Sequence, residues 1–532
     1  MSQSDSTMRP VGDGATLPNP RQSEMGMPGL RSVTPERILR AIWLTARKAA
    51  SFPVLMAVIL TGVALYGIHD RLPDPDTWWH IAVGQRILST HIFPTSDIYS
   101  FTAQGVHWIA YEWLGEIAMG IAAQAGGLVG LAILQMCLVA LVTWLLYYYA
   151  YLRCGNWKAS FVATGLLLPI ATAIFSLRPQ LFGYIFLLLT LICLERFRQG
   201  HSRALWILPP LFLLWVNVHG TFVFGLAAIG VYFASGLVKF EAAGLVAEPW
   251  TGRQRVQLLF ATFLCTAALL VTPYGSELAA YPLQMATMQP LNVASIQEWQ
   301  PLSFSLFLGK YLLTLVLFIF VGHIFYPLKY RLHELAMLLF GVYAACVHLR
   351  FVLIFVMLIA PIAAKFVAEW MPRYEADKDK YGLNLAIMAL LAIVAARFMP
   401  RKAELESVVA KDYPVAAVEY LRQHPSPTGM FNEYGFGGYL IWQLGPQHKV
   451  FIDGRADMYE YSGVFQDYMS IINLDLNTLS LLRRYDIQSC LIGRKSALAT
   501  LLAASPEWKK AYTDDLSEIF VRSRPDAFAG RQ

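Results

Sequence analysis

The sequence predicts a mainly α-helical membrane protein, with a bundle of about eleven spans followed by a small extracytoplasmic α/β domain. Two observations carry this prediction. Hydrophobic residues make up 56% of the 532 positions and charged residues only 15%, whereas an ordinary soluble domain is about 45–50% apolar and about 25% charged. The apolar residues also gather in long runs that lipid can accommodate and a single globular core cannot. These features exclude a soluble enzyme, a disordered scaffold and a collagen-like chain.

Charge and cysteine usage exclude two further classes. The formal net charge of +6 comes from 42 basic and 36 acidic residues, and so small an excess gives no reason to expect nucleic acid as a partner. The six cysteines include no Cys-x-x-Cys motif and no Cys/His cluster. Structural zinc and thioredoxin-type redox chemistry are therefore not expected.

The N-terminal segment is predicted to lie on the cytoplasmic side. Residues 1–32 are rich in Ser, Pro, Gly and Met and lack hydrophobic periodicity, so we expect a disordered tail. In 33–50, Thr34 and Pro35 form a helix start, and basic residues then alternate with Ile, Leu and Trp. This pattern predicts a basic amphipathic helix on an anionic membrane surface.

The predicted transmembrane domain covers residues 51–399 and contains apolar segments of roughly 15–23 residues each. Two longer apolar runs are divided, at 217–220 and at 348–350, because a single helix rising ~1.5 Å per residue would be too long for the bilayer. The predicted spans are 52–69, 128–150, 160–177, 180–195, 204–218, 221–238, 257–272, 304–326, 334–348, 351–369 and 382–398.

The basic residues predict the orientation of this bundle. With the N-terminus inside, every predicted inner loop carries Lys or Arg, as the positive-inside rule requires. Arg401 and Lys402, just after the last span, run against the rule. An odd number of spans places 400–532 outside the cytoplasm, so we expect a multi-pass plasma-membrane protein with a periplasmic or extracellular C-terminal domain.

Residues 400–532 are predicted to form that α/β domain, because short apolar bursts alternate with helical patterns. Within it, Asp453, Arg455 and Asp457 are either a buried ion pair beside a turn or the edge of a binding surface. The predicted strands are 429–431, 450–452 and 489–492, and the predicted helices are 413–422, 463–472, 477–484 and 496–504.

The first predicted outer segment, 70–127, is unusually long and places carboxylates among Trp and Tyr residues that favour the headgroup level. Asp74 and Asp76 flank a proline, and His80 follows. Each Asp is either a helix cap or a carboxylate that takes a proton from a hydroxyl or holds a divalent cation. Glu112 is either an exposed interfacial carboxylate or a functional one.

Arg178 and Arg350 lie at predicted outer helix junctions, where a buried cation needs an anion. Asp97 or Glu298 could supply that anion within the protein. A lipid phosphate or diphosphate is the alternative, because guanidinium binds phosphate in a bidentate way. His219 interrupts an apolar run at the same predicted face and is either a packing residue or part of the site.

Together these residues resemble the C-type (GT-C) membrane glycosyltransferases, which share a short inner segment, one span and a long outer loop with an early acidic residue. A closer resemblance is to poorly characterised bacterial members of this superfamily with an extracytoplasmic C-terminal domain. The matching motifs are Asp74 to His80, Glu112 to Leu114, Arg178 to Gln180, Asn217 to Gly220, His348 to Phe351, Asn432 to Gly435 and Ile452 to Arg455.

This resemblance implies an enzyme that takes a sugar from a polyprenyl phosphate or diphosphate and transfers it, with inversion, to an extracytoplasmic glycan, lipid or protein. It implies that Asp74 or Asp76 is the catalytic carboxylate, acting as base or, with a divalent cation, as metal ligand; no other cofactor is expected. The residues expected to bind substrate are His80, Glu112, Arg178, His219, Glu298 and Arg350.

Two rival functions remain open from the sequence. A transporter or flippase for a lipid-linked sugar or polymer would use the same arginines and need no base, although inverted repeats typical of transporters are not evident. A non-catalytic membrane assembly protein would use its outer domain to bind a partner. Membrane lipids surround the chain under all three hypotheses.

Overall fold

The computed structural model describes residues 35–69, 74–397, 399–424 and 429–523. The predicted tail, 1–32, lies outside these ranges, and so does the start of the predicted first outer segment, 70–73. By its internal contacts the chain divides into two compact units, 1–49 and 50–532.

The described part of the first unit is a single helix, α1 (Pro35–Ala49), with Arg47 and Lys48 in its last turn. Its apolar side chains Ile42, Trp43 and Leu44 are 59%, 57% and 51% exposed. The predicted helix is therefore present, and its placement on a membrane surface stays a prediction.

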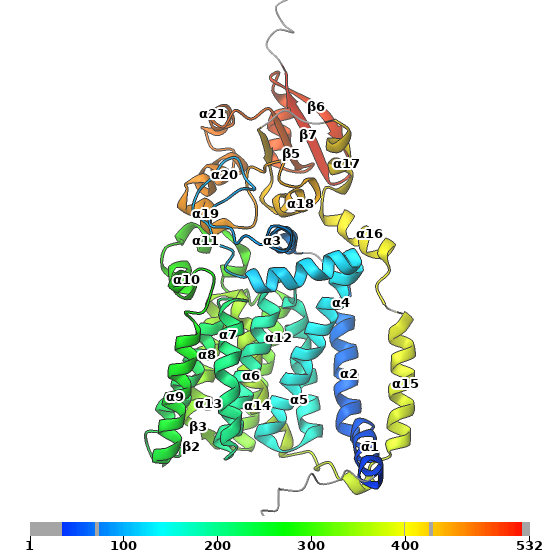
Figure 1. The fold of residues 1–532 in the computed structure, drawn as a ribbon, viewed down its shortest axis with the longest axis vertical. Coiled ribbons are helices and arrows are strands. Elements are labelled where there is room, and N and C mark those ends of the chain that lie inside the picture. The colour runs from blue at the N-terminus through cyan, green and yellow to red at the C-terminus, as the bar shows by residue number, and fades with distance from the viewer. Residues whose placement is uncertain (1–34, 70–73, 398, 425–428, 524–532) are drawn as a thin grey trace, which may run out of the picture. The chain divides into compact units, whose positions relative to one another are not determined.

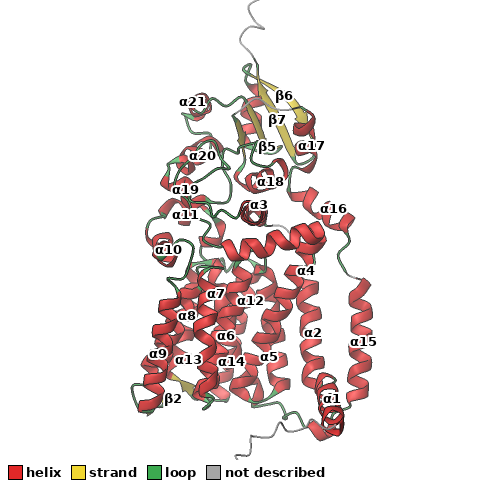
Figure 2. Ribbon diagram, viewed as in Figure 1, coloured by secondary structure: helices red, strands yellow, loops and turns green. Residues whose placement is uncertain are grey.

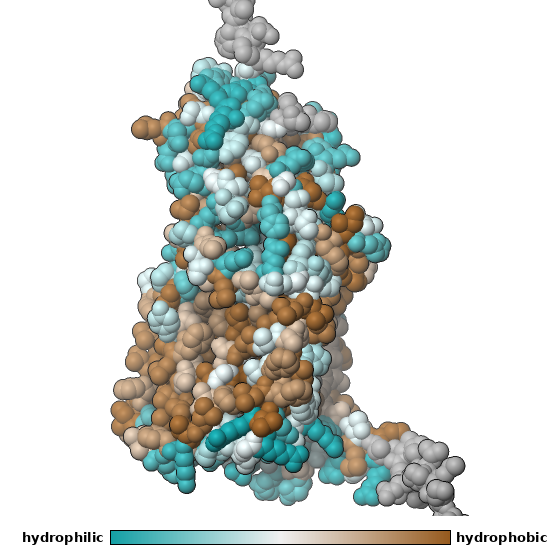
Figure 3. Space-filling model, turned by 60° about the vertical axis from the view of Figure 1, so that its left-hand side comes forward, coloured by the Kyte–Doolittle hydropathy of each residue, from teal (hydrophilic) through white to brown (hydrophobic). Residues whose placement is uncertain are grey.

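In the second unit, long apolar helices form a bundle (Figures 1 and 2). The helix α14 (Val352–Ala368) is buried along most of its length and packs against α4 and α5. In contrast, α12 and α15 expose apolar side chains, and Figure 3 shows a broad apolar surface over this part of the molecule. The other bundle helices are α2 (Phe52–Gly67), α4 (Trp113–Cys154), α5 (Trp157–Ile174), α6 (Gln180–Arg198), α7 (Leu208–Val216), α8 (Phe222–Ser235), α9 (Gly252–Ala268), α12 (Phe307–Phe325), α13 (Leu332–Val347) and α15 (Tyr381–Arg397).

Helices overlap all the predicted spans, but fewer helices have the length and apolar character of a full membrane crossing. Among the described residues, 5 helices satisfy both criteria, or up to 7 if each of two bent pairs is one span. Three further apolar helices are shorter. The protein therefore has a membrane-spanning bundle, and the count of eleven spans stays a prediction.

The two apolar runs divided in the prediction are also broken in the structure. The first break separates α7 from α8, and the second is a turn of 3-10 helix, η3 (Leu349–Phe351), between α13 and α14. Both breaks leave polar side chains at helix ends, where they can reach a common site.

Helix α4 is sharply bent at Gly127, where the backbone has φ 56° and ψ −135°. A residue with a Cβ rarely adopts this conformation, so glycine permits the bend. Before the bend α4 lies across the ends of the bundle helices, and after it α4 runs within the bundle (Figure 1).

The C-terminal region contains a four-stranded sheet in the order β4-β5-β7-β6, with β4 and β5 parallel and the other neighbours antiparallel. The expected α/β character is present, but residues 450–452 form only an isolated bridge, from Val450 to Ser100 of the first outer segment, instead of the predicted strand. The strands are β4 (Met430–Asn432), β5 (Ser489–Gly493), β6 (Trp508–Thr513) and β7 (Ser517–Arg522). The helices are α16 (Lys402–Asp412), α17 (Val415–Gln423), α18 (Tyr434–Leu444), α19 (Ala456–Tyr461), α20 (Val464–Ile472), α21 (Thr478–Arg484) and α22 (Ala497–Ala504).

The C-terminal region shares one hydrophobic core with the first outer segment. The helix α3 (Pro75–Thr90) of that segment packs against α18, with the ring of Trp78 4.9 Å from that of Trp442 and 5.2 Å from that of Tyr439. Burial of three aromatic rings in one contact is a large apolar contribution. The start of α3 is therefore held between the bundle and the C-terminal region.

Candidate functional site

The two aspartates of the first outer segment lie at the N-terminus of α3. Asp74 is the N-cap residue: its side chain accepts a hydrogen bond from the N–H of Asp76 (3.0 Å), and Thr77 completes a capping box. Pro75 fits the first helical position because its missing N–H is not needed there. Of the two carboxylates, Asp74 is thus the helix cap, and the side chain of Asp76 has no part in capping.

Both aspartates contact Arg178, which lies at the junction between α5 and α6. Arg178 donates from Nε to Asp74 Oδ1 (2.6 Å), its Nη2 is 2.5 Å from the same oxygen, and its Nη1 is 2.9 Å from Asp76 Oδ2. A third carboxylate, Glu298, lies 2.6 Å from Nη2. One guanidinium therefore holds three carboxylates, which leaves this cluster with an excess of negative charge.

The fifth predicted polar residue of this area, Arg350, has no carboxylate partner among the described residues. It belongs to η3, and its guanidinium lies 4.1 Å from the ring centroid of Trp299, the neighbour of Glu298 in the short helix η2 (Gln297–Trp299). A stacked guanidinium keeps its N–H groups available at its edge. Arg350 is thus a cation that can accept an anionic ligand.

A second group of polar side chains is connected by contacts that involve His80 of α3. Glu112 lies 3.4 Å from His80 Nε2 and 3.2 Å from His219 Nε2, and His80 Nδ1 lies 3.1 Å from Glu116. Because Thr221 donates its N–H to His219 Nδ1 (3.1 Å), the ring proton of His219 is on Nε2 and is donated to Glu112. The sequence predicted His80, Glu112 and His219 as site residues, and the structure adds Glu116 to this group.

Burial changes the protonation of this site. Loss of solvent raises the pKa of Asp76 to about 7 although Arg178 opposes the shift, and it raises the pKa of Glu112 to about 8. It also lowers the pKa of His219 to about 3, with Arg350 and Arg178 adding to the effect. At neutral pH, Glu112 is protonated, His219 is neutral, and Asp76 is poised between its two states, as a general base requires.

The carboxylates do not form a metal site in this arrangement. No group of three or more His, Cys, Asp or Glu residues is placed to hold a metal ion in the described ranges. Asp74, Asp76 and Glu298 all direct their oxygens at Arg178, so the guanidinium occupies the position that a cation would need. The divalent cation considered from the sequence has no fitting set of free ligands here.

The C-terminal region contributes its backbone to the site at Gly454. A Cβ at this position would lie 1.8 Å from Asp76 Oδ1 and 2.7 Å from Trp79 Nε1, and Trp79 Nε1 donates to the same carboxylate oxygen (3.1 Å). Tyr434 donates its hydroxyl to the carbonyl oxygen of Gly454 (3.1 Å). The absence of a side chain thus lets the main chain approach the carboxylate closely.

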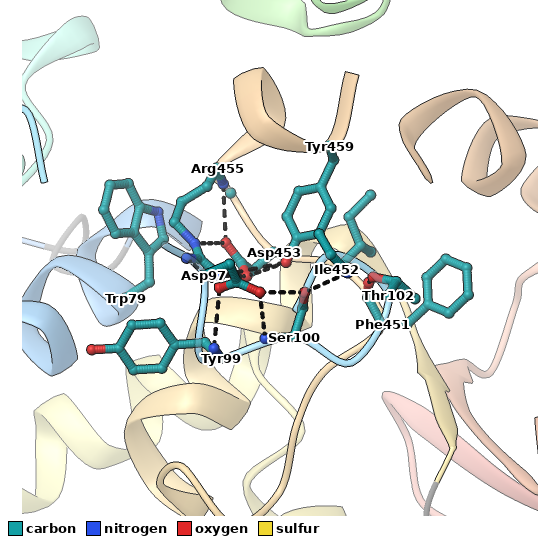
Figure 4. A network of polar contacts seen from close by, with 12 residues as sticks. Trp79, Asp97, Tyr99, Ser100, Thr102, Phe451, Ile452, Asp453, Arg455 and Tyr459 are labelled. Atoms are coloured by element: carbon teal, nitrogen blue, oxygen red, sulfur yellow. Dashed lines mark hydrogen bonds and ion pairs between the residues drawn. The ribbon is translucent and has the colours of Figure 1, made fainter. Parts of the chain in front are cut away.

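A buried ion network fixes this glycine (Figure 4). Arg455, fully buried, donates to Asp453 (2.8 and 2.7 Å), lies 2.7 Å from Asp97 of the first outer segment, and stacks over Trp108 at 4.7 Å. Tyr459 donates to Asp453 at 2.6 Å. Of the alternatives left open by the sequence, the Asp453–Arg455 pair is the buried ion pair.

The structure places the eight predicted site residues in the contacts given above, and it decides two of the alternatives that the sequence left open. Asp97 is not the partner of Arg178 or Arg350, because Arg455 holds it. Glu112 is 7% exposed and therefore not an exposed interfacial carboxylate. Sequence reasoning missed Gly454 as a neighbour of the carboxylates, although the motif Ile452 to Arg455 marked the segment.

Comparisons with known proteins give similarities to solved structures alone. No protein-family model matches the chain, and no curated protein matches it significantly. The chain is similar to the apo oligosaccharyltransferase of Archaeoglobus fulgidus (TM-score 0.45, 12% identity, 83% of this chain and 69% of that one). The same protein in complex with Zn and sulfate gives a TM-score of 0.39 at 12% identity, covering 82% and 68% of the two chains.

The chain is also similar to ArnT from Cupriavidus metallidurans bound to undecaprenyl phosphate (TM-score 0.44, 14% identity, 92% of this chain and 100% of that one). At these TM-scores and identities, the function of this chain has to be argued from its own residues.

Proposed function

We propose that this chain is a glycosyltransferase that moves a sugar from a polyprenyl phosphate or diphosphate to an acceptor outside the cytoplasm. The observation that carries the proposal is one cluster at the end of the bundle: Arg178 joins Asp76 to Glu298, and Arg350, which has no carboxylate partner among the described residues, stacks on Trp299 next to Glu298. A base and a phosphate-binding cation are the two groups that this transfer needs.

Asp76, and not Asp74, acts as the base in this proposal. Asp74 is committed to capping α3 and to two contacts with Arg178. Asp76 has a single contact with Arg178 and a pKa of about 7. It can therefore take the proton of an acceptor hydroxyl at physiological pH, while Arg178 fixes the position of its carboxylate.

The transfer is a single displacement at the anomeric carbon of the sugar. The acceptor oxygen, as it loses its proton to Asp76, forms the new bond to that carbon, and the bond from carbon to phosphate oxygen breaks. The phosphate leaves with the bonding electrons, and Arg350 stabilises its added negative charge. One displacement inverts the anomeric configuration. Glu112, His219 and His80 provide hydrogen bonds that orient the sugar.

The proposal orients the chain with the site outside the cytoplasm, as the positive-inside rule predicts from the sequence. The transmembrane domain, 51–399, carries the lipid substrate, and the region 400–532 lies outside the cytoplasm over α3. The long first outer segment belongs with that region. The acceptor, whether glycan, lipid or protein, approaches from this side.

Single-turnover assays on the purified protein test the proposal. Labelled polyprenyl phosphate sugars are offered with candidate acceptors, and release of the polyprenyl phosphate is measured. We expect Asp76→Asn to lose ~10²–10⁴-fold in rate, which is the usual contribution of a general base. Asp74→Asn should lose much less, because Asn also serves as an N-cap.

The matched control is Asp412→Asn, an exposed aspartate of α16, which should leave the rate unchanged. Retention of full activity in Asp76→Asn would remove the proposed base. If the wild-type protein binds the lipid-linked sugar but never cleaves it, the transporter hypothesis takes precedence.

A further inference from the structure

A polar hollow lies at the end of the bundle opposite to α3, where the surface is rich in charged side chains (Figure 3). It consists of two adjoining cavities of about 490 and 460 Å³ that share Arg153 and Lys329 in their walls. A small sheet of β1 (Phe240–Ala242), β2 (Leu245–Ala247) and β3 (Tyr330–Arg331) borders the larger cavity. None of these residues belongs to the proposed site.

Most cations of the hollow are already neutralised. Arg153 pairs with Glu334, Lys329 with Glu241 (2.8 Å) and Arg331 with Glu195 (2.5 Å). Lys365, in the wall of the smaller cavity, pairs with Glu369 (2.7 Å). These pairs build the wall and leave little capacity for a further anion.

Arg198 is the exception in the larger cavity. It has no carboxylate partner among the described residues; its Nη2 donates to Ser235 (3.3 Å), and its guanidinium stacks 4.2 Å from the ring centroid of Trp250. Its buried Nε has no hydrogen-bond partner in the part of the chain that the structure describes. A buried guanidinium N–H without a partner is costly, because desolvation is not compensated.

A second buried nitrogen without a partner lines the same cavity. His333, at the start of α13, is only 1% exposed, and its Nε2 has no hydrogen-bond partner within the described ranges. Its ring packs 4.2 Å from that of Tyr232, which fixes its direction. Arg198 Nε and His333 Nε2 thus offer two nitrogen groups in one polar cavity that can donate to an oxygen-rich ligand.

We infer that the larger cavity binds a phosphate group, held by Arg198 and His333. Guanidinium and imidazole N–H groups both donate to phosphate oxygens, and Arg does so in a bidentate way. Glu241 and Glu248 also line the cavity, but both are exposed side chains of the β1–β2 hairpin. The solvent-exposed acids therefore have water as an alternative partner, whereas the Arg198 Nε and the His333 Nε2 are buried.

The source of the phosphate is either a phospholipid headgroup or a free phosphate. The position favours the lipid, because basic pockets between membrane helices at this level hold the headgroups of anionic lipids. The cavity volume of about 490 Å³ falls within the range of small-molecule sites and exceeds what one phosphate ion needs.

Binding is tested on the delipidated full-length protein. Phosphatidylglycerol, phosphatidylcholine or inorganic phosphate is titrated, and the midpoint of thermal unfolding and the bound mass in native mass spectrometry are measured. We expect phosphatidylglycerol to raise the midpoint and to bind one molecule per chain with the tightest affinity. Arg198→Gln should weaken this binding ~10–100-fold, the usual effect of losing a charge-assisted hydrogen bond.

The matched control is Arg253→Gln, because Arg253 is exposed on α9 and does not line either cavity. Arg198→Lys and His333→Gln keep a donor at each position and serve if Arg198→Gln does not fold. Stabilisation by inorganic phosphate alone would identify a soluble phosphate as the ligand. Equal binding in Arg198→Gln and wild type, or no binding of any of the three probes, would overturn the inference.

Discussion

At the scale of single residues, the two carboxylates of one short motif differ because the chain uses them differently. Asp74 caps the N-terminus of α3 and contacts two nitrogen atoms of Arg178. Asp76, two positions later, is free of capping and keeps a pKa of about 7. A spacing of two residues around a proline is enough to separate a structural acid from a proposed base.

The pH dependence of transfer follows from this difference. Asp76 must be ionised to accept a proton, so the rate should fall as the pH drops below about 7. Arg178 lowers the pKa of Asp76, so Arg178→Gln should raise that pKa and move the acid limb to higher pH. Rate measurements from pH 5 to 9 check both expectations. An acid limb of the pH–rate profile that stays at the same pH in Arg178→Gln would contradict them. The exposed Arg422 provides the control variant Arg422→Gln.

The site residues could be predicted because polar side chains stand out in an apolar sequence. Asp76, Arg178 and Arg350 each interrupt a pattern that favours lipid. Gly454 could not be placed in the same way, because a glycine that permits a close approach has no local signature. The sequence leaves Asp97 open as an anion for Arg178 or Arg350, because its actual partner, Arg455, lies in a region that the sequence treats as a separate domain.

At the scale of elements, the segment after Ile452 sets the surroundings of the proposed base. Gly454→Ala should displace the Asp76 carboxylate, because the new Cβ would lie 1.8 Å from its Oδ1. A displacement of about 1 Å at reacting groups can cost ~10²-fold in rate, and we expect a loss of that order. The control is Gly435→Ala, where an added Cβ meets nothing within 4 Å. Equal rates in the two variants would contradict the role given to Gly454.

The bend of α4 gives a second prediction at this scale. Gly127→Ala places a Cβ on a backbone with φ 56°, and we expect a loss of ~1–3 kcal/mol in stability. Its neighbour Gly126 is helical and has open space around its Cα, so Gly126→Ala should be neutral or stabilising. Thermal unfolding in a lipid nanodisc measures both. A common shift for the two variants would show that the bend does not depend on glycine.

At this scale, the sequence predicts where most helices lie better than it predicts which elements pack against each other. Apolar runs identified every bundle helix, since length and hydropathy are local properties. The helix α18 was missed, because Tyr434 to Leu444 contains glycines that lower helix propensity. Its stability comes from packing against α3, which no local pattern reveals. The strand predicted at 450–452 is absent for a related reason. This segment makes a single bridge to Ser100 of the first outer segment, and no local pattern reveals that contact.

At the scale of the whole molecule, the ion network around Arg455 joins two parts of the chain. Arg455→Met would leave Asp97 and Asp453 buried without a cation, and breaking a buried pair in this way costs ~3–5 kcal/mol. We expect a lower unfolding midpoint and faster proteolysis of the C-terminal region. Arg494→Met, at an exposed arginine, is the control. Unchanged stability in Arg455→Met would show that the network does not hold the two parts together.

The contact between Thr102 and Phe451 joins residues 349 positions apart, and this separation has a consequence for biosynthesis. At ~5–20 residues per second, a ribosome needs about 20–70 s to make the intervening chain. During that time the aromatic face of α3 has no partner, and its aspartates cannot be enclosed. A nascent chain that has inserted most of its helices thus still lacks the arrangement on which any chemistry would depend, and a premature stop late in the message would yield an inserted but inert product.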